Sequence, residues 1–173
     1  MKGVIALCTK ELIVKSFGED KWKKILSDAG LETEPLILPI SNVDDSIIMN
    51  IVKSGCKILN LTLEQFADAF GDYWINVYSQ RMYKTFYSQS KNAKEFLLNM
   101  DNVHKLMTKN MEGATPPHFE YETPSDNVLI MKYFSKRGLI DFVVGLVKGV
   151  AKYYKEDVNV KKLDNQRVEI TFK

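Results

Sequence analysis

Residues 116–134, PPHFEYETPSDNVLIMKYF, divide the chain into two kinds of sequence. From this point on, β-branched and aromatic residues form short runs or alternate with polar ones, which is typical of strands. The expected strands are centred on Phe119–Tyr121, Val128–Phe134, Val158–Val160 and Val168–Phe172. Asp164–Gln166 supplies turn residues between the last two, so neighbouring strands are expected to pair antiparallel.

A series of helices is expected before Pro116, because apolar residues recur there every three or four positions. The apolar series are Val4–Leu12, Trp22–Ala29, Ile47–Val52, Phe66–Val77 and Leu97–Met111. Thr62 and Gln65 form a capping-box pair at the start of the fourth helix. Ser90 is expected to start the fifth helix, and Asp101 to cap its continuation.

One more helix, Leu139–Tyr154, is expected between the second and third strands. The predicted fold class is therefore α+β, a helical N-terminal lobe followed by a four-stranded antiparallel sheet with a crossing helix. The length favours a single domain over residues 1–173. Within it we expect a helical subdomain over about residues 1–60, and a site formed mainly by about residues 61–173.

The composition excludes several classes of protein. Lys and Arg number 24 against 22 Asp and Glu, and no basic run suggests a nucleic-acid-binding face. Cys8 and Cys56 fit neither a metal finger nor a disulfide framework, which favours a reducing, cytoplasmic location. No signal peptide opens the chain, and its most apolar window, Leu139–Ala151, is too short to span a bilayer. We expect neither a nucleic-acid partner nor direct membrane insertion.

Chemistry-bearing motifs are scarce. The Gly-rich phosphate loops, the G-x-S-x-G elbow and the H-E-x-x-H helix of common enzymes are missing, and only two histidines occur. One of them, His104, lies between Met100 and Met107 in the apolar stripe of the fifth helix. Two interpretations stay open. The imidazole is either a core histidine satisfied by the backbone or by Asp101, or an axial ligand of a haem iron that Asp101 orients.

The second candidate feature is Tyr133, Ser135 and Arg137. Alternate positions of a strand point to one face, so two hydroxyls and a guanidinium are expected to converge, as a clamp for a carboxylate or phosphate. The alternative is an edge strand with solvated polar residues. A haem would explain both this clamp and His104, since it carries iron at its centre and two propionates at its rim. Gly113–Pro117 either ends the helix or supplies a rigid proline as a wedge against a flat ligand.

These residues match a known family. MDNVH at 100–104 and GATPP at 113–117 resemble the proximal helix and following turn of the haem nitric oxide/oxygen binding (H-NOX) family. That family includes the haem sensor domain of soluble guanylate cyclase. Tyr133-x-Ser135-x-Arg137 is similar to its Y-x-S-x-R propionate clamp. Met1–Gly3 and Phe70–Gly71 also resemble family members, so the likeness covers essentially the whole chain.

The resemblance implies that haem b, iron protoporphyrin IX, binds between the lobes with His104 as the proximal ligand of ferrous iron. The implied haem contacts are Pro117, which would distort the porphyrin, Met100 and Met107, with Tyr133, Ser135 and Arg137 on the propionates. In such proteins nitric oxide binds the open face and commonly releases the histidine. The implied function is therefore gas sensing through release or movement of His104, and not catalysis.

The distal wall is expected to decide which gas binds. Family members that hold oxygen stably have a hydrogen-bonding Tyr at the position of Phe142, and Ile5 and Leu146 complete an apolar lining here. Trp74 and Tyr78 carry donors that would replace the missing one if they pointed into the pocket, but both also fit as core aromatics. We expect a protein that binds nitric oxide and carbon monoxide and forms no stable oxygen complex.

Two other functions compete with this one. The first is a module for a non-haem apolar carboxylate, such as a fatty acid, held by Arg137 with His104 merely structural. The second is a haem peroxidase or monooxygenase, which is disfavoured because the other histidine, His118, follows Pro117 on the proximal side. By family analogy the effector is a histidine kinase, a cyclic-di-nucleotide enzyme or a fused chemotaxis receptor. The end at Lys173, directly after the last strand, favours an excised sensor domain.

Overall fold

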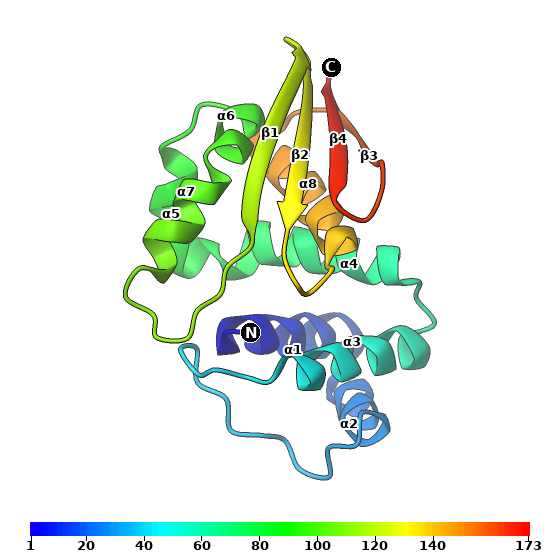
Figure 1. The fold of residues 1–173 in the computed structure, drawn as a ribbon. Coiled ribbons are helices and arrows are strands. Elements are labelled where there is room, and N and C mark those ends of the chain that lie inside the picture. The colour runs from blue at the N-terminus through cyan, green and yellow to red at the C-terminus, as the bar shows by residue number, and fades with distance from the viewer.

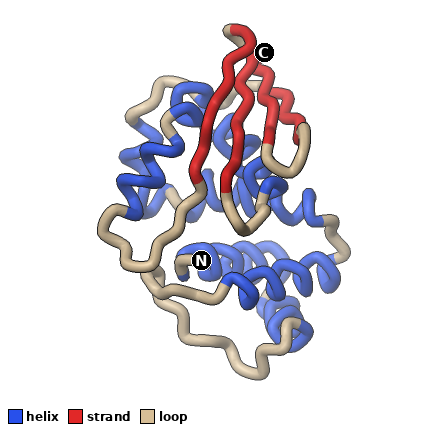
Figure 2. Tube along the Cα trace, in the orientation of Figure 1, coloured by secondary structure: helices blue, strands red, loops and turns tan.

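The computed structural model describes residues Met1–Lys173 as a helical part followed by a sheet with a crossing helix (Figures 1 and 2). The first part contains α1 (Gly3–Phe17), α2 (Glu19–Asp28), α3 (Asp45–Leu59), α4 (Leu63–Tyr73), the π-helical turn η1 (Trp74–Tyr78), α5 (Gln80–Ser88), α6 (Ala93–Leu98) and α7 (Met100–Thr108). The second contains β1 (His118–Ser125), β2 (Val128–Phe134), α8 (Ile140–Tyr154), β3 (Val158–Lys162) and β4 (Arg167–Phe172). The predicted α+β class is confirmed. None of the helices has both the length and the apolar character needed to cross a membrane.

The sheet has the strand order β1-β2-β4-β3, and every neighbouring pair is antiparallel, as predicted. The Asp164 side chain accepts a hydrogen bond from the backbone N–H of Gln166 at 2.8 Å and closes the turn between β3 and β4. α8 lies across one face of the sheet (Figure 1), where Val147, Leu129 and Ile170 are almost fully buried in one apolar cluster. This apolar layer fixes β2, whose end leads into the candidate site.

α8 also crosses α4 at very short range, because both helices present glycines at the contact. A β-carbon built on Gly149 would lie 2.6 Å from the carbonyl oxygen of Gly71, and one built on Gly145 would overlap the backbone of α4. Two ion pairs join the same helices, Asp68–Lys148 at 2.6 Å and Asp72–Lys152 at 2.7 Å. The crossing therefore holds the sheet and its helix against the helical part of the chain.

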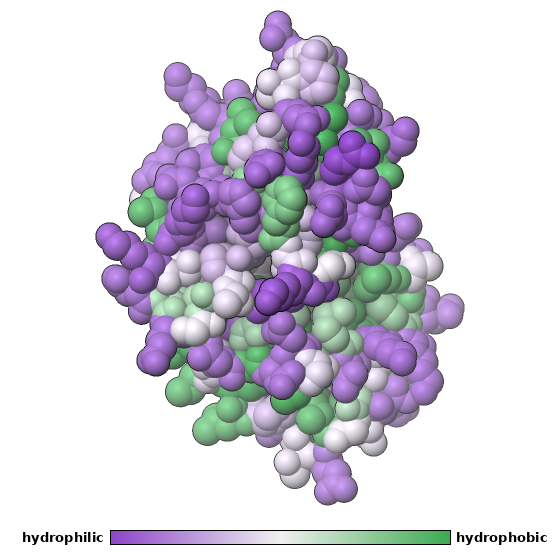
Figure 3. Space-filling view, in the orientation of Figure 1, coloured by the Kyte–Doolittle hydropathy of each residue, from purple (hydrophilic) through white to green (hydrophobic).

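α1, α2 and α3 pack around a second apolar cluster, to which α4 contributes Phe66. Thr62 starts α4 as predicted: its hydroxyl accepts from the N–H of Gln65 at 3.1 Å, and the Gln65 side chain accepts from the N–H of Thr62 at 2.9 Å. The loop before α3 leaves Leu36 and Ile40 exposed. Figure 3 shows hydrophilic side chains over most of the upper part of this face, with apolar ones gathered lower down. The proposed subdomain boundary near residue 60 stays a prediction.

The start of α6 corrects one expectation. The capping side chain is that of Asn92, which accepts from the N–H of Glu95 at 2.8 Å. Ser90 was the wrong choice, because its own N–H bonds to the carbonyl of Tyr87 and so belongs to the turn that ends α5.

The helix that carries His104 is also shorter than the apolar stripe suggested. The chain turns at Asn99, so α6 and α7 are separate helices, and Met111 lies beyond the end of α7. Asp101 stands in the first turn of α7 and does not cap it. The apolar stripe continues across the break because Asn99 has a helical backbone conformation. The turn therefore rotates the chain by nearly the same angle as a helical residue does.

Candidate functional site

A cavity of about 450 Å³ lies between the helical part and the sheet. Its walls come from α1, α3, η1, α7, α8 and the segments on either side of the β1–β2 pair. A second cavity of about 100 Å³ adjoins it and shares His104, Met107 and Phe119 of its lining. Pockets of this size and apolar character hold small molecules and cofactors in other proteins.

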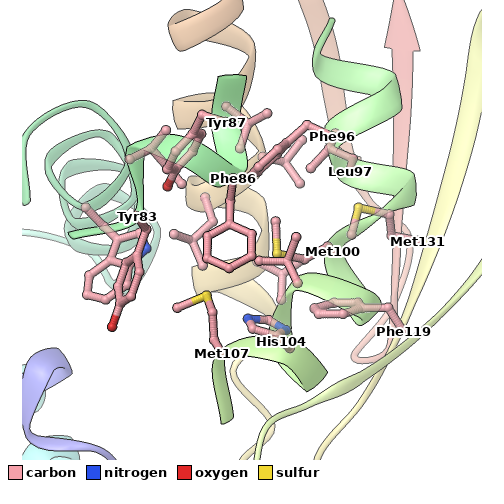
Figure 4. Close-up of a pocket in the computed structure, with 17 residues that line it drawn as sticks. Tyr83, Phe86, Tyr87, Phe96, Leu97, Met100, His104, Met107, Phe119 and Met131 are labelled. Atoms are coloured by element: carbon pink, nitrogen blue, oxygen red, sulfur yellow. The ribbon is translucent and has the colours of Figure 1, made fainter. Parts of the chain in front are cut away.

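His104 lies where the two cavities meet. Figure 4 shows its imidazole on α7 between Met107 and Phe119, with Phe86 of α5 across the space. The ring stacks against that of Phe119 with centroids 5.8 Å apart. Its Nδ1 atom is fully buried and has no hydrogen-bond partner. Burial lowers the pKa of His104, against the opposing charge of Asp101, so the ring is held in the neutral form that binds metals.

The unpartnered nitrogen bears on the two interpretations of His104. A core histidine is satisfied by the backbone or by a neighbouring side chain, and neither does so here. A buried ring nitrogen without a partner is unfavourable by about 1–3 kcal/mol, which a bound ligand would recover. The geometry therefore favours a ligand on this imidazole.

Asp101 does not contact the imidazole that it was expected to orient. Its carboxylate accepts from the backbone N–H of Phe119 at 3.0 Å and lies 2.8 Å from Nδ1 of His118 and 2.7 Å from Nζ of Lys105. Burial acts to raise the pKa of Asp101, but the hydrogen bonds from Lys105, Phe119 and His118 outweigh it and lower the pKa to about 2. Asp101 ties α7 to β1 instead.

Tyr133, Ser135 and Arg137 all line the large cavity, as the alternation predicted. The Arg137 guanidinium is held in place by residues far away in sequence: Nε donates to Asp45 at 2.7 Å, and Nη1 and Nη2 donate to the carbonyl and hydroxyl of Thr115 at 2.7 and 2.9 Å. Ser135 accepts from the N–H of Arg137 at 3.3 Å. The clamp is thus anchored on α3 and on the loop before β1.

Five of the seven methionines line the large cavity, and Met100 and Met131 line the small one. Pro117 is also in the wall of the large cavity, next to β1. Methionine fills irregular apolar space and adapts to a bulky ligand, so this concentration suits a large, flat, apolar molecule.

The wall opposite α7 contains Ile5, Phe142, Leu146 and Trp74, as expected. Phe142 packs edge-on against Phe70 with ring centroids 5.4 Å apart. The indole N–H of Trp74 makes no hydrogen bond, whereas the ring itself is stacked on Phe70. This wall is therefore apolar apart from the donor that Trp74 carries.

Tyr78 is placed differently from Trp74. Its ring is 8% exposed, stacks on Trp74 and lies under the guanidinium of Arg81, and it is not part of the lining of either cavity. The π-helical turn explains the difference, because its wider winding shifts later residues around the helix axis. A donor at position 78 is thus directed away from the cavity.

Thr9 and Tyr83 are among the polar residues of the lining that sequence reasoning missed. Thr9 follows Ile5 by one helical turn, and that spacing would have identified it. Its hydroxyl donates to the carbonyl of Ile5 at 2.9 Å. Tyr83 follows the π-helical turn, so no regular helical spacing from Trp74 would have placed it in the lining.

The residues present fit a haem. A neutral imidazole without a partner faces a largely apolar cavity of sufficient size, and a guanidinium with two hydroxyl side chains stands at one edge. Those are the donors that an iron atom and two carboxylates need.

Comparisons with known proteins agree with this geometry. A family model described as "Haem-NO-binding" matches residues 2–162. The soluble guanylate cyclase gcy-32 of Caenorhabditis elegans is 31% identical over 160 residues, which are 88% of this chain and 23% of that protein. The chain spans about a quarter of the length of the first curated relatives it matches.

Solved structures show the same likeness. An oxygen-binding H-NOX domain, solved as its oxygen complex and described as related to soluble guanylate cyclases, superposes with a TM-score of 0.82 at 26% identity. The match covers 100% of this chain and 95% of that one. A variant of the T. tengcongensis H-NOX domain gives a TM-score of 0.84 at 27% identity, over 100% and 98% of the two chains.

Proposed function

Because this chain belongs to the haem-NO-binding (H-NOX) family, we propose that it is a haem-based gas sensor for nitric oxide and carbon monoxide. The cofactor proposed is haem b with ferrous iron. The observation that carries the proposal is the buried, unpartnered ring nitrogen of His104 at the wall of a cavity large enough for a cofactor. Sensing, and not turnover, is the proposed role of these residues.

His104 would hold the iron from one side, and Arg137, Tyr133 and Ser135 would bind the propionates. When bound, the haem supplies an iron centre at which a diatomic gas binds. Burial keeps the His104 ring unprotonated and ready to coordinate. Asp45 and Thr115 already orient the guanidinium, so little side-chain entropy is lost when it meets a carboxylate.

Other residues of the lining shape the cavity. Pro117 is rigid and stands in its wall, where it would press on the ring edge of a flat ligand. Met107 lies beside His104, and Met100 lines the adjoining cavity. These soft side chains would fill the space around the ligand and keep water out.

The composition of the gas-facing wall supports the proposed exclusion of oxygen. Bound dioxygen carries partial negative charge and gains from a hydrogen-bond donor, whereas nitric oxide and carbon monoxide need one less. Phe142 has no donor, Thr9 uses its hydroxyl on Ile5, and Tyr78 lies outside the lining. Trp74 and Tyr83, whose rings lie side by side with centroids 6.4 Å apart, are then the candidate donors on this side of the cavity, and we propose that neither of them stabilises an oxygen complex.

Replacing Phe142 with Tyr tests this selectivity. We expect Phe142→Tyr to bind oxygen at least about tenfold more tightly than the wild type, since a hydrogen bond to a charged group contributes about 1.5–3 kcal/mol. The measurement is the absorption spectrum of the reduced protein in air, followed over time. Phe142→Leu is the control without a donor and should behave as the wild type. A long-lived oxygen complex of the wild-type protein would overturn the proposed selectivity.

The proposed signal begins with release or movement of His104 when nitric oxide binds. α7 would then shift against β1, to which Asp101 connects it. The curated relatives are guanylate cyclases. We propose that the effector is a cyclase, a histidine kinase, a cyclic-di-nucleotide enzyme or a fused chemotaxis receptor. Titrating the reduced protein with nitric oxide and carbon monoxide tests the function itself. Each gas should give a distinct spectrum, and unchanged spectra would refute the proposal.

A further inference from the structure

α7 packs on the sheet through the stacked rings of His104 and Phe119 and through hydrogen bonds that one residue makes. Every hydrogen bond between the two is made by Asp101: its N–H donates to the hydroxyl of Tyr121 at 3.2 Å, its carboxylate accepts from the N–H of Phe119 at 3.0 Å, and Oδ1 lies 2.8 Å from Nδ1 of His118. Asp101 stands one helical turn before His104. The position of the candidate iron ligand therefore depends on how firmly this carboxylate is held.

His118 is the one imidazole among the partners of Asp101. Its side chain is 53% exposed, and its ring is held in place by stacking on Phe134, with centroids 5.8 Å apart. Two other charged groups face the pair. Nζ of Lys105 lies 2.7 Å from the second oxygen of Asp101, and a carboxylate oxygen of Glu120 lies 3.8 Å from Nε2 of His118.

Protonation changes what this contact contributes. A neutral imidazole donates one hydrogen bond to the Asp101 carboxylate, whereas the protonated ring adds a unit positive charge beside it. Exposed ion pairs of this kind change an equilibrium by about two- to fivefold. The docking of α7 on β1 is therefore expected to tighten as the pH falls through the range in which imidazoles titrate.

We propose that His118 is a positioning residue that docks α7 on β1 through Asp101 in a proton-dependent manner, and so sets how readily His104 leaves the iron. The second half rests on the function proposed above. Release of His104 requires α7 to move, and a tighter dock opposes that movement. Acidification would thereby weaken the response to nitric oxide, without any change in the residues that face the gas.

The first test follows the equilibrium for release of His104. Reduced, haem-loaded wild type and His118→Asn receive nitric oxide, and absorption spectra give the fraction in which His104 has left the iron between about pH 5.5 and about pH 8.5. Asn keeps a neutral donor near the Nδ1 position. Any titration of His104 itself occurs in both proteins and cancels in the ratio of their release constants. We divide the release constant of the wild type by that of His118→Asn at each pH. We expect this ratio to be near one at high pH and to fall about two- to fivefold at low pH.

The second test reads the dock itself, without gas. Hydrogen exchange of the backbone N–H of Val103, which bonds to the carbonyl of Asn99 at 3.0 Å, reports opening of the first turns of α7. We expect its protection, corrected for intrinsic exchange rates, to rise about two- to fivefold on acidification in the wild type and to stay constant in His118→Asn.

Lys105→Met is the matched control, because it removes the other charged partner of the Asp101 carboxylate and leaves His118 in place. It should lower the protection of Val103 by a similar factor at every pH and leave the pH dependence intact. If the protection of Val103 depends on pH equally in the wild type and in His118→Asn, the proposed proton-dependent docking is wrong. If hydrogen exchange behaves as expected but the protein takes up no haem, the proposed function is wrong, whereas the proposed docking of α7 on β1 is still supported. If hydrogen exchange behaves as expected but the ratio of release constants does not change with pH, docking of α7 does not control release of His104.

Discussion

Replacing His104 with glycine is expected to remove most of the bound haem from the purified protein. The imidazole is the only side chain in either cavity with an unpartnered ring nitrogen whose lone pair can bind a metal, so the iron would lose its protein ligand. Imidazole added during purification should restore haem binding, because the glycine leaves room for it. The measurement is haem content per protein chain, from the intense haem absorption band.

The rescued His104→Gly protein also separates binding from signalling. Free imidazole is not connected to α7, so nitric oxide should still bind but should no longer change hydrogen exchange in that helix. The other histidine provides the control, since His118→Asn should retain its haem. If nitric oxide changes hydrogen exchange in α7 of His104→Gly, without imidazole, as much as it does in the wild type, the role assigned to His104 is contradicted.

The second large effect is expected at the crossing of α4 and α8. Gly145→Ala should reduce the free energy of unfolding by about 3 kcal/mol, because the added methyl group overlaps backbone that has little room to move. Higher helix propensity alone would stabilise the variant by about 1 kcal/mol, so even the sign of the result is informative. Urea unfolding, followed by circular dichroism, measures the difference.

A variant of the same helix controls for this experiment. Lys148→Ala removes the ion pair with Asp68 but fits the crossing, and it should change the free energy of unfolding by no more than about 1 kcal/mol. Stability of Gly145→Ala equal to or above that of the wild type would show that the helices are not in the close contact described.

Local patterns predicted most of the fold. The β-branched and aromatic run Val128–Phe134 predicted β2 with the bounds that the structure shows, and the Thr62–Gln65 pair predicted the start of α4. Such features depend on neighbours in sequence, so a single chain reveals them. The break at Asn99 escaped notice because the apolar spacing continues through it.

The sequence predicted the site residues themselves but not the residues that hold them in place. His104 and the triplet ending in Arg137 follow short, regular patterns, and the structure places all of them on one cavity. Asp45, which holds the guanidinium, is 92 residues away from it, and no local pattern connects the two. The π-helical turn likewise changes which aromatic residues face the cavity, and that winding depends on packing.

The central claim is that His104 binds the iron of a haem in this cavity, and resonance Raman spectroscopy of the reduced protein without gas tests it most directly. The account predicts an iron–histidine stretching band in the wild type that is absent from His104→Gly. It also predicts that imidazole gives the variant a band of its own, since the ligand is then no longer tied to the chain. A wild-type protein that retains haem but shows no such band, or one that shows the same band in His104→Gly without imidazole, would contradict the claim.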